Sequence, residues 1–177
     1  MELGLLILRV VIGALFVGHG AQKLFGAFGG HGLKGTAGFF ESIGLRPGRA
    51  HATAAGMSEL AGGALLALGL ITPLAAVLLI ATMTAAIVTV HASKGVWVSD
   101  GGYEYNVVLA AVAFAVAAIG PGPWSLDRAL GLTESGAGWA LGALALGLAG
   151  GIGAVVSGRL QERDERGAGG GSEVHAT

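Results

Sequence analysis

Five long runs of apolar residues constrain this chain more than any other feature. They lie near residues 3–25, 50–70, 73–92, 103–120 and 138–157. A helix needs about 20 mostly apolar residues to cross a bilayer. Inside lipid every backbone N–H and C=O group must be paired within the protein, which a helix achieves by itself. The runs therefore predict an all-α, antiparallel transmembrane helical bundle.

The composition agrees with a membrane location and removes several classes of function. Hydrophobic residues make up 53% of the chain and charged residues only 12%, about half the charged share of a soluble domain. A length of 177 residues suits one domain. The net charge of −1 gives no reason to expect nucleic acid as a partner. The chain has no cysteine, which excludes disulfides, thiolate metal sites and cysteine redox chemistry.

Local signals set the ends of the predicted helices. Thr72 and Pro73 are a natural N-cap and first residue for the third span. The Gly-Pro-Gly-Pro run at 120–123 must end the fourth span, and Ser125 is placed to cap a short turn. Before the second span, residues 36–45 form a short amphipathic segment, whose aromatic side chains we expect in the membrane interface.

The chain divides into three parts on this reading. Residues 1–131 form a four-helix membrane domain, residues 132–158 add a fifth transmembrane helix, and the charged tail 159–177 is expected to be disordered. Fifteen of the 34 glycines lie within the apolar runs, where a missing side chain allows helices to approach closely. Basic residues gather in the first and third loops and after the last span. This bias predicts a bacterial plasma-membrane protein with its N-terminus outside and its C-terminus inside.

Three ionisable residues share one face of the first span. At about 100° per residue, Arg9, His19 and Lys23 project on the same side of the helix. Charged groups in hydrocarbon are costly and usually face a cavity or a partner. Alternatively, Arg9 and Lys23 extend to opposite membrane surfaces and only their stems are buried.

Glu59 is the most informative polar residue. It lies eight to nine residues into the second span, about 12 Å along the helix, and its own helix offers no basic partner at that depth. The carboxyl group is therefore either protonated or paired with a cation from another helix. A helix-to-helix hydrogen bond with no further role is the structural alternative.

An antiparallel bundle would bring Glu59 close to residues from three other helices. The end of the first span, the start of the second, the end of the third and the start of the fourth share one membrane face. We therefore predict Glu59 as the catalytic proton carrier and expect ligand-binding roles for His19, Lys23, His91, Glu104 and Arg9. Haem bound by His19 and His91 is a weaker alternative, and no metal-binding motif is present.

Six ordered motifs between about residues 5 and 131 resemble the DoxX family of small bacterial membrane proteins. They are Arg9-x3-Gly13-x2-Phe16-x2-His19-Gly20-x2-Lys23-Leu24-Phe25-Gly26, Glu59-x2-Gly62-Gly63, Gly69-Leu70-Ile71-Thr72-Pro73, the stretch from Met83 to His91, Gly102-Tyr103-Glu104-Tyr105, and Gly120-Pro121-Gly122-x2-Ser125-Leu126-Asp127. The usual family pattern has four spans, so the fifth span and the charged tail depart from it.

The resemblance implies membrane redox metabolism. The family includes proteins similar to subunits of thiosulfate–quinone oxidoreduction and of a terminal quinol oxidase, and others associated with anchoring redox-defence enzymes. We therefore expect a subunit of a redox complex that binds a quinone or another lipophilic carrier, with electrons supplied by a partner enzyme. The alternatives are a non-enzymatic anchor for soluble redox enzymes and, with less support, a small-solute transporter. A homo-oligomer is compatible with each of these.

Overall fold

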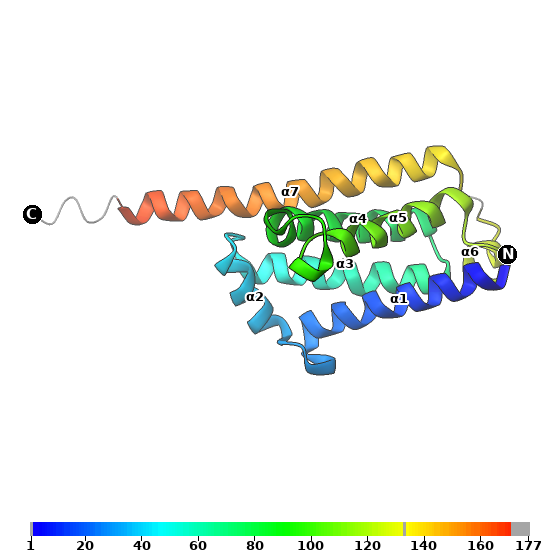
Figure 1. The fold of residues 1–177 in the computed structure, drawn as a ribbon, viewed down its shortest axis with the longest axis horizontal. Helices are drawn as coiled ribbons and strands as arrows, with labels where there is room; N and C mark the ends of the chain where they lie inside the picture. The colour runs from blue at the N-terminus through cyan, green and yellow to red at the C-terminus, as the bar shows by residue number, and fades with distance from the viewer. Residues whose placement is uncertain (1, 133, 171–177) are drawn as a thin grey trace, which may run out of the picture.

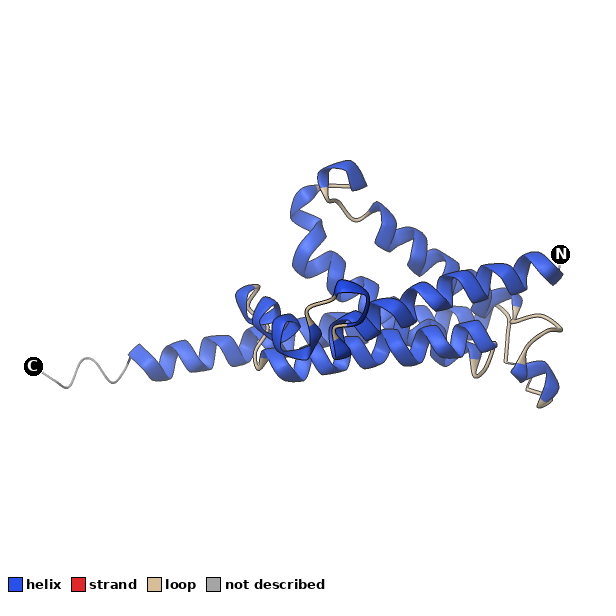
Figure 2. Ribbon diagram, turned by 90° about the horizontal axis from the view of Figure 1, so that it is seen from below, coloured by secondary structure: helices blue, strands red, loops and turns tan. Residues whose placement is uncertain are grey.

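The computed structural model describes residues 2–132 and 134–170. Within these ranges every regular element is helical, which confirms the predicted all-α bundle (Figures 1 and 2). Successive long helices run in alternating directions. The elements in chain order are α1 (Glu2–Phe25), η1 (Ala27–Gly29), α2 (Gly32–Ser42), α3 (Gly48–Leu68), α4 (Thr72–Ala86), η2 (Ile87–His91), η3 (Ala92–Lys94), η4 (Val98–Asp100), α5 (Glu104–Ile119), α6 (Leu126–Ala129) and α7 (Ala137–Gly170).

Among the described residues, three helical segments are both long enough and apolar enough to cross a membrane. They are Glu2–Phe25, Thr72–Lys94 and Ala137–Glu165, and the apolar α5 is shorter. The predicted second span corresponds to α3, which has 21 residues but a more polar sequence. α3 contacts α1, α2 and α4, and Figure 1 shows it between α1 and α4. Three neighbouring helices therefore shield part of this more polar helix from lipid.

Glycines allow α1 and α3 to pack backbone against backbone. A Cβ atom on Gly13 would lie 2.5 Å from the Gly63 carbonyl oxygen, and one on Gly20 would lie 2.6 Å from the Leu60 nitrogen. The predicted role of the intramembrane glycines is thus seen directly at this interface. Because the two axes approach so closely, side chains at the C-terminal end of α1 come within reach of α3.

Close packing at glycine residues also joins α7 to α4. A Cβ atom on Gly147 would lie 2.6 Å from the Ile80 side chain, and one on Gly151 would lie 2.5 Å from the Ala81 carbonyl oxygen. A second pair of α7 glycines with the same four-residue spacing, Gly138 and Gly142, faces open space. Only the pair Gly147 and Gly151 therefore makes a close helix contact.

α7 extends beyond the predicted end of the fifth span. The mixed-charge residues that follow were expected to be disordered, but the helix continues through Gly170, and residues 171–177 lie outside the described part of the chain. Glu165 Oε2 pairs with Arg46 Nη1 at 3.0 Å, and the Gly158 carbonyl accepts a hydrogen bond from the Arg46 nitrogen. These contacts attach the extension to the α2–α3 turn. Figure 1 shows α7 projecting past the bundle beyond this point.

The amphipathic segment predicted at residues 36–45 is the helix α2. It begins earlier than expected, at Gly32, and runs steeply across the direction of the long helices (Figures 1 and 2). Its buried Thr36 hydroxyl donates a hydrogen bond to the Lys23 carbonyl at 3.3 Å. This contact places α2 against the end of α1.

We predict that Gly20→Val destabilises the bundle. The added side chain would meet the α3 backbone, with Leu60 N at 2.6 Å and Gly56 O at 2.7 Å from the Cβ position alone. Overpacking of this kind costs about 1–3 kcal/mol. Thermal unfolding of the purified protein in detergent measures the loss. Gly18→Val on the same helix is the matched control, because nothing lies within 4 Å of its Cβ position; equal melting of the two variants would contradict the prediction.

Candidate functional site

A buried ion pair joins the end of α1 to the middle of α3. Lys23 Nζ lies 2.5 Å from Glu59 Oε2, and Glu59 is only 3% exposed. The sequence left open whether this carboxyl group would be protonated or paired, and the structure supplies the cation from the neighbouring helix. Burying two charges is costly, and their direct contact offsets part of that cost. Lys23 retains partial access to solvent, so the pair sits at the edge of the buried region.

A cavity of about 510 Å³ borders this ion pair. Its volume is within the range of small-molecule sites. The walls come from α2, α3, α4 and α7, with one contribution from α1, and are mostly apolar. The lining residues are Lys23, Phe39, Phe40, Ile43, Leu45, His51, Ala54, Ala55, Ser58, Glu59, Val77, Leu78, Ala81, Thr82, Ala85, Ala86, Thr89, Val90, Leu146, Gly150, Gly151, Ala154 and Val155.

The other polar groups of the cavity were not singled out from the sequence. The Thr82 and Thr89 hydroxyls donate to the carbonyls of Leu78 and Ala85, four residues earlier, so only their oxygen lone pairs face the cavity. Ser58 and His51 project from α3. They are seven residues apart, about two helical turns, and therefore share one face of α3. This shared face was the signal in the sequence that could have pointed to them.

His19 lies beside the ion pair but outside the cavity lining. Its ring is exposed, Nδ1 lies 3.1 Å from Gln22 Oε1, and it interacts electrostatically with Glu59. Three of the predicted site residues, His19, Lys23 and Glu59, are therefore brought together in the structure.

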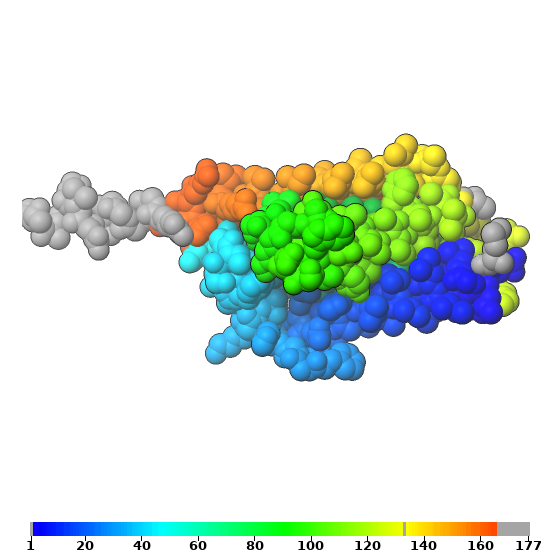
Figure 3. Space-filling view, in the orientation of Figure 1, coloured from blue at the N-terminus to red at the C-terminus, as the bar shows by residue number. Residues whose placement is uncertain are grey.

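His91 and Glu104 have other contacts. His91 Nδ1 lies 2.7 Å from the Gly101 carbonyl oxygen, and Glu104 Oε2 accepts a hydrogen bond from the Val98 nitrogen at 3.1 Å. Both side chains hold the loop between α4 and α5, which stands out in green on the face shown in Figure 3. The predicted regular end of the third span is replaced by a π-helical turn, Ile87–His91. Neither residue lines the cavity, so His91 and Glu104 are separated from the group formed by His19, Lys23 and Glu59.

Arg9 belongs to the opposite end of the bundle. Fourteen residues separate it from Lys23, about 21 Å along the helix axis. Arg9 does not extend to the membrane surface: it is 1% exposed and its Nη2 donates a 2.6 Å hydrogen bond to the Trp124 carbonyl. A Cβ atom on Gly69 would overlap the guanidinium group, so glycine leaves the space that Arg9 occupies. The expected ligand-binding role beside Glu59 does not fit this position.

Asp127 compensates Arg9 and caps α4. It is buried and interacts electrostatically with Arg9. Its carboxylate accepts hydrogen bonds from the Ile71 nitrogen at 2.6 Å, the Thr72 nitrogen at 3.0 Å and the Thr72 hydroxyl at 2.6 Å. The predicted N-cap role of Thr72 is therefore taken by a carboxylate distant in sequence, which also suits the positive end of the helix dipole.

The turn that carries Asp127 was predicted correctly. The Ser125 hydroxyl accepts a hydrogen bond from the Arg128 nitrogen at 3.2 Å and caps α6. The Asp127 nitrogen donates to the Gly69 carbonyl at 2.8 Å, which fixes the turn against the α3–α4 connection.

Comparisons with known proteins identify the family of this chain. The sequence model of the DoxX family matches residues 4–92. A Bacillus subtilis (strain 168) protein named "Putative oxidoreductase CatD" is 36% identical over 115 residues, which cover 65% of this chain and 79% of that protein. The chain belongs to the DoxX family. No solved structure matches it.

The DoxX match includes only part of the cavity. Residues 4–92 contain α1 to α4 and hence the ion pair and three walls. The fourth wall comes from α7, beyond the matched residues. This member of the DoxX family therefore bounds its cavity with a helix that the family match does not contain.

We predict that Asp127→Ala strongly destabilises the protein. The change leaves the buried Arg9 charge uncompensated and removes three hydrogen bonds from the start of α4. Removing one member of a buried charge pair costs about 3–5 kcal/mol. The measurement is thermal unfolding in detergent with Arg128→Ala, an exposed neighbour, as the control. Similar melting temperatures for the two variants would show that Asp127 does not have this role.

Proposed function

We propose that this chain is a membrane subunit of a redox complex and binds a quinone in the cavity beside Lys23 and Glu59. The supporting observation is one apolar cavity of about 510 Å³ with a buried ion pair in its wall. A quinone has an apolar ring and tail and two carbonyl oxygens that accept hydrogen bonds. Such a molecule needs mostly apolar walls and a few placed polar groups.

The ion pair can perform the proton chemistry of a quinone. Reduction to the quinol takes up two electrons and two protons, one proton at each carbonyl oxygen. The Lys23 ammonium has three donor hydrogens and uses one on Glu59, so another can bind a quinone oxygen. Glu59 would carry protons to the reduced oxygen, and the exposed His19 beside it would exchange them with water. The electrons would come from, or pass to, a partner redox protein, and no cysteine of this chain takes part in their transfer.

The comparisons support a redox role but do not identify the molecule that is bound. Membership of the DoxX family and a relative named as a putative oxidoreductase both point to redox metabolism. The assignment of a quinone rests on the cavity itself.

An anchor for soluble redox enzymes is the second candidate. The observation in its favour is the charged end of α7, which projects past the bundle (Figure 1). In that case the ion pair would serve helix packing alone, and the cavity would need no quinone.

We predict that Glu59→Gln weakens quinone binding about tenfold or more. The change removes the charge that holds Lys23 in place, and a hydrogen bond involving a charged group contributes about 1.5–3 kcal/mol. The measurement is equilibrium binding of a short-tailed quinone to the purified chain in mild detergent.

A double variant separates binding from folding. Lys23→Met with Glu59→Leu replaces the ion pair with apolar groups, an exchange that proteins often tolerate. We expect the double variant to melt near the wild-type temperature and to bind quinone as poorly as Glu59→Gln. Unchanged binding in both variants, or no binding by the wild type, would reject the quinone site and favour the anchor.

We predict that Gly150→Leu also lowers quinone affinity, by filling the α7 wall. A Cβ atom at Gly150 would make an ordinary 3.7 Å contact with the Ala81 Cβ atom, and the rest of the side chain would enter the cavity that Gly150 lines. Gly153→Leu is the control, because nothing lies within 4 Å of that position. Quinone titrations of the two variants should differ by about tenfold; equal affinities would exclude α7 from the site.

A further inference from the structure

A second hollow lies on the side of α2 away from the quinone cavity. This hollow, called the α2 groove below, has a volume of about 470 Å³. It is lined by Leu33, Lys34, Ala37, Gly38 and Glu41 of α2 and by Arg49 of α3. The groove and the cavity share no lining residue, so a ligand in one does not require a ligand in the other.

Two cations and one carboxylate line the α2 groove. Within the described residues, neither Lys34 nor Arg49 forms an ion pair, and both side chains are exposed. Glu41 is the acidic residue of the lining, and its Oε1 already accepts a hydrogen bond from the Gly48 nitrogen at 3.2 Å. Arg46, close by in sequence, differs because it pairs with Glu165. The groove therefore carries two cations and one carboxylate and has a net positive charge.

Exposed phenylalanines lie at the same end of the bundle as the groove. Phe25, at the end of α1, and Phe28, in η1, are 72% and 80% exposed. Phe28 has φ of 50° and ψ of 37°, a left-handed conformation that is costly for a bulky residue. Large, exposed apolar side chains at the ends of spanning helices are typical of a position among lipid headgroups and upper acyl chains.

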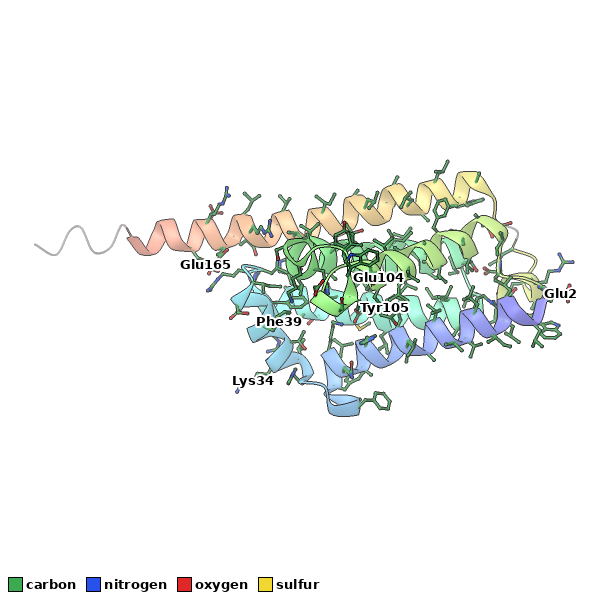
Figure 4. All side chains as sticks on the ribbon, viewed as in Figure 1. Glu2, Lys34, Phe39, Glu104, Tyr105 and Glu165 are labelled. Atoms are coloured by element: carbon green, nitrogen blue, oxygen red, sulfur yellow. The ribbon has the colours of Figure 1, made fainter. Side chains whose placement is uncertain are left out.

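The orientation of α2 fits an interfacial position. It runs across the spanning helices at the end of the bundle (Figures 1 and 2). Figure 4 shows Lys34 pointing away from the bundle, while Phe39 projects from another side of α2. A helix lying in the membrane plane with cations on one side and aromatic groups on another is typical of contact with anionic lipids.

We propose that the α2 groove binds the phosphate headgroup of an anionic phospholipid. Arg49 can donate two parallel hydrogen bonds to phosphate oxygens, and Lys34 adds a point charge. Two exposed cations hold a free anion only weakly in water. A phospholipid adds apolar contact between its acyl chains and the neighbouring phenylalanines, so the occupant is a lipid and not free phosphate.

The test compares lipid retention by the purified full-length chain. The protein is delipidated in mild detergent and given equal amounts of phosphatidylglycerol and phosphatidylcholine, and bound lipid is counted by native mass spectrometry. We expect the wild type to retain phosphatidylglycerol preferentially, and Lys34→Gln with Arg49→Gln to reduce that preference about tenfold. Thermal unfolding checks that the variant is folded, which we expect because both side chains are exposed.

Lys94→Gln is the matched control, because Lys94 is an exposed cation in the α4–α5 loop outside the groove. It should keep the wild-type preference, and millimolar inorganic phosphate should not displace the lipid. The proposal is overturned if the wild type has no preference for phosphatidylglycerol, if the double variant keeps it, or if Lys94→Gln loses it equally. Displacement by inorganic phosphate would overturn the assignment to a lipid.

Discussion

The structure depends on the requirement that charges buried in a membrane bundle find partners. The glycines of α1 and α3 bring the two backbones into contact, and this close approach puts Lys23 on Glu59. At the other end of α1, Arg9 fills the space that Gly69 leaves and is compensated by Asp127. Both ends of one helix are therefore tied to the rest of the bundle by buried charge. Without these partners, the polar α3 would be a poor membrane helix.

The cavity follows from how the bundle surrounds α3. α1, α2 and α4 contact this helix closely, while α7 packs on α4 through Gly147 and Gly151 and contacts α3 only slightly. The space left between α3 and α7 is the apolar cavity with Lys23 and Glu59 in its wall. The small residues of α7 therefore have two effects. Its glycines permit contact with α4, and the small residues Gly150, Gly151 and Ala154 in the cavity wall leave room for a ligand.

The candidate site shows where sequence reasoning succeeds and fails. Helical periodicity correctly placed His19 and Lys23 on one face, and the antiparallel order correctly brought that face to Glu59. It failed for His91 and Glu104, because a π-helical turn and a folded loop give both side chains backbone partners. It also failed for Arg9, whose partner Asp127 lies more than a hundred residues away. His51 and Ser58 were overlooked, since the sequence does not show that the face of α3 they share borders a cavity.

The sequence by itself determined the membrane bundle, because hydropathy and helix length are local properties that lipid imposes on each segment separately. It also determined which residues were too polar to face lipid, and its ordered motifs already resembled the DoxX family. Only the tertiary structure decided which charge compensates which, that α7 forms a cavity wall, and that Asp127 caps α4. These outcomes depend on distances between helices, which are set by side-chain volumes at interfaces formed by residues far apart in the chain.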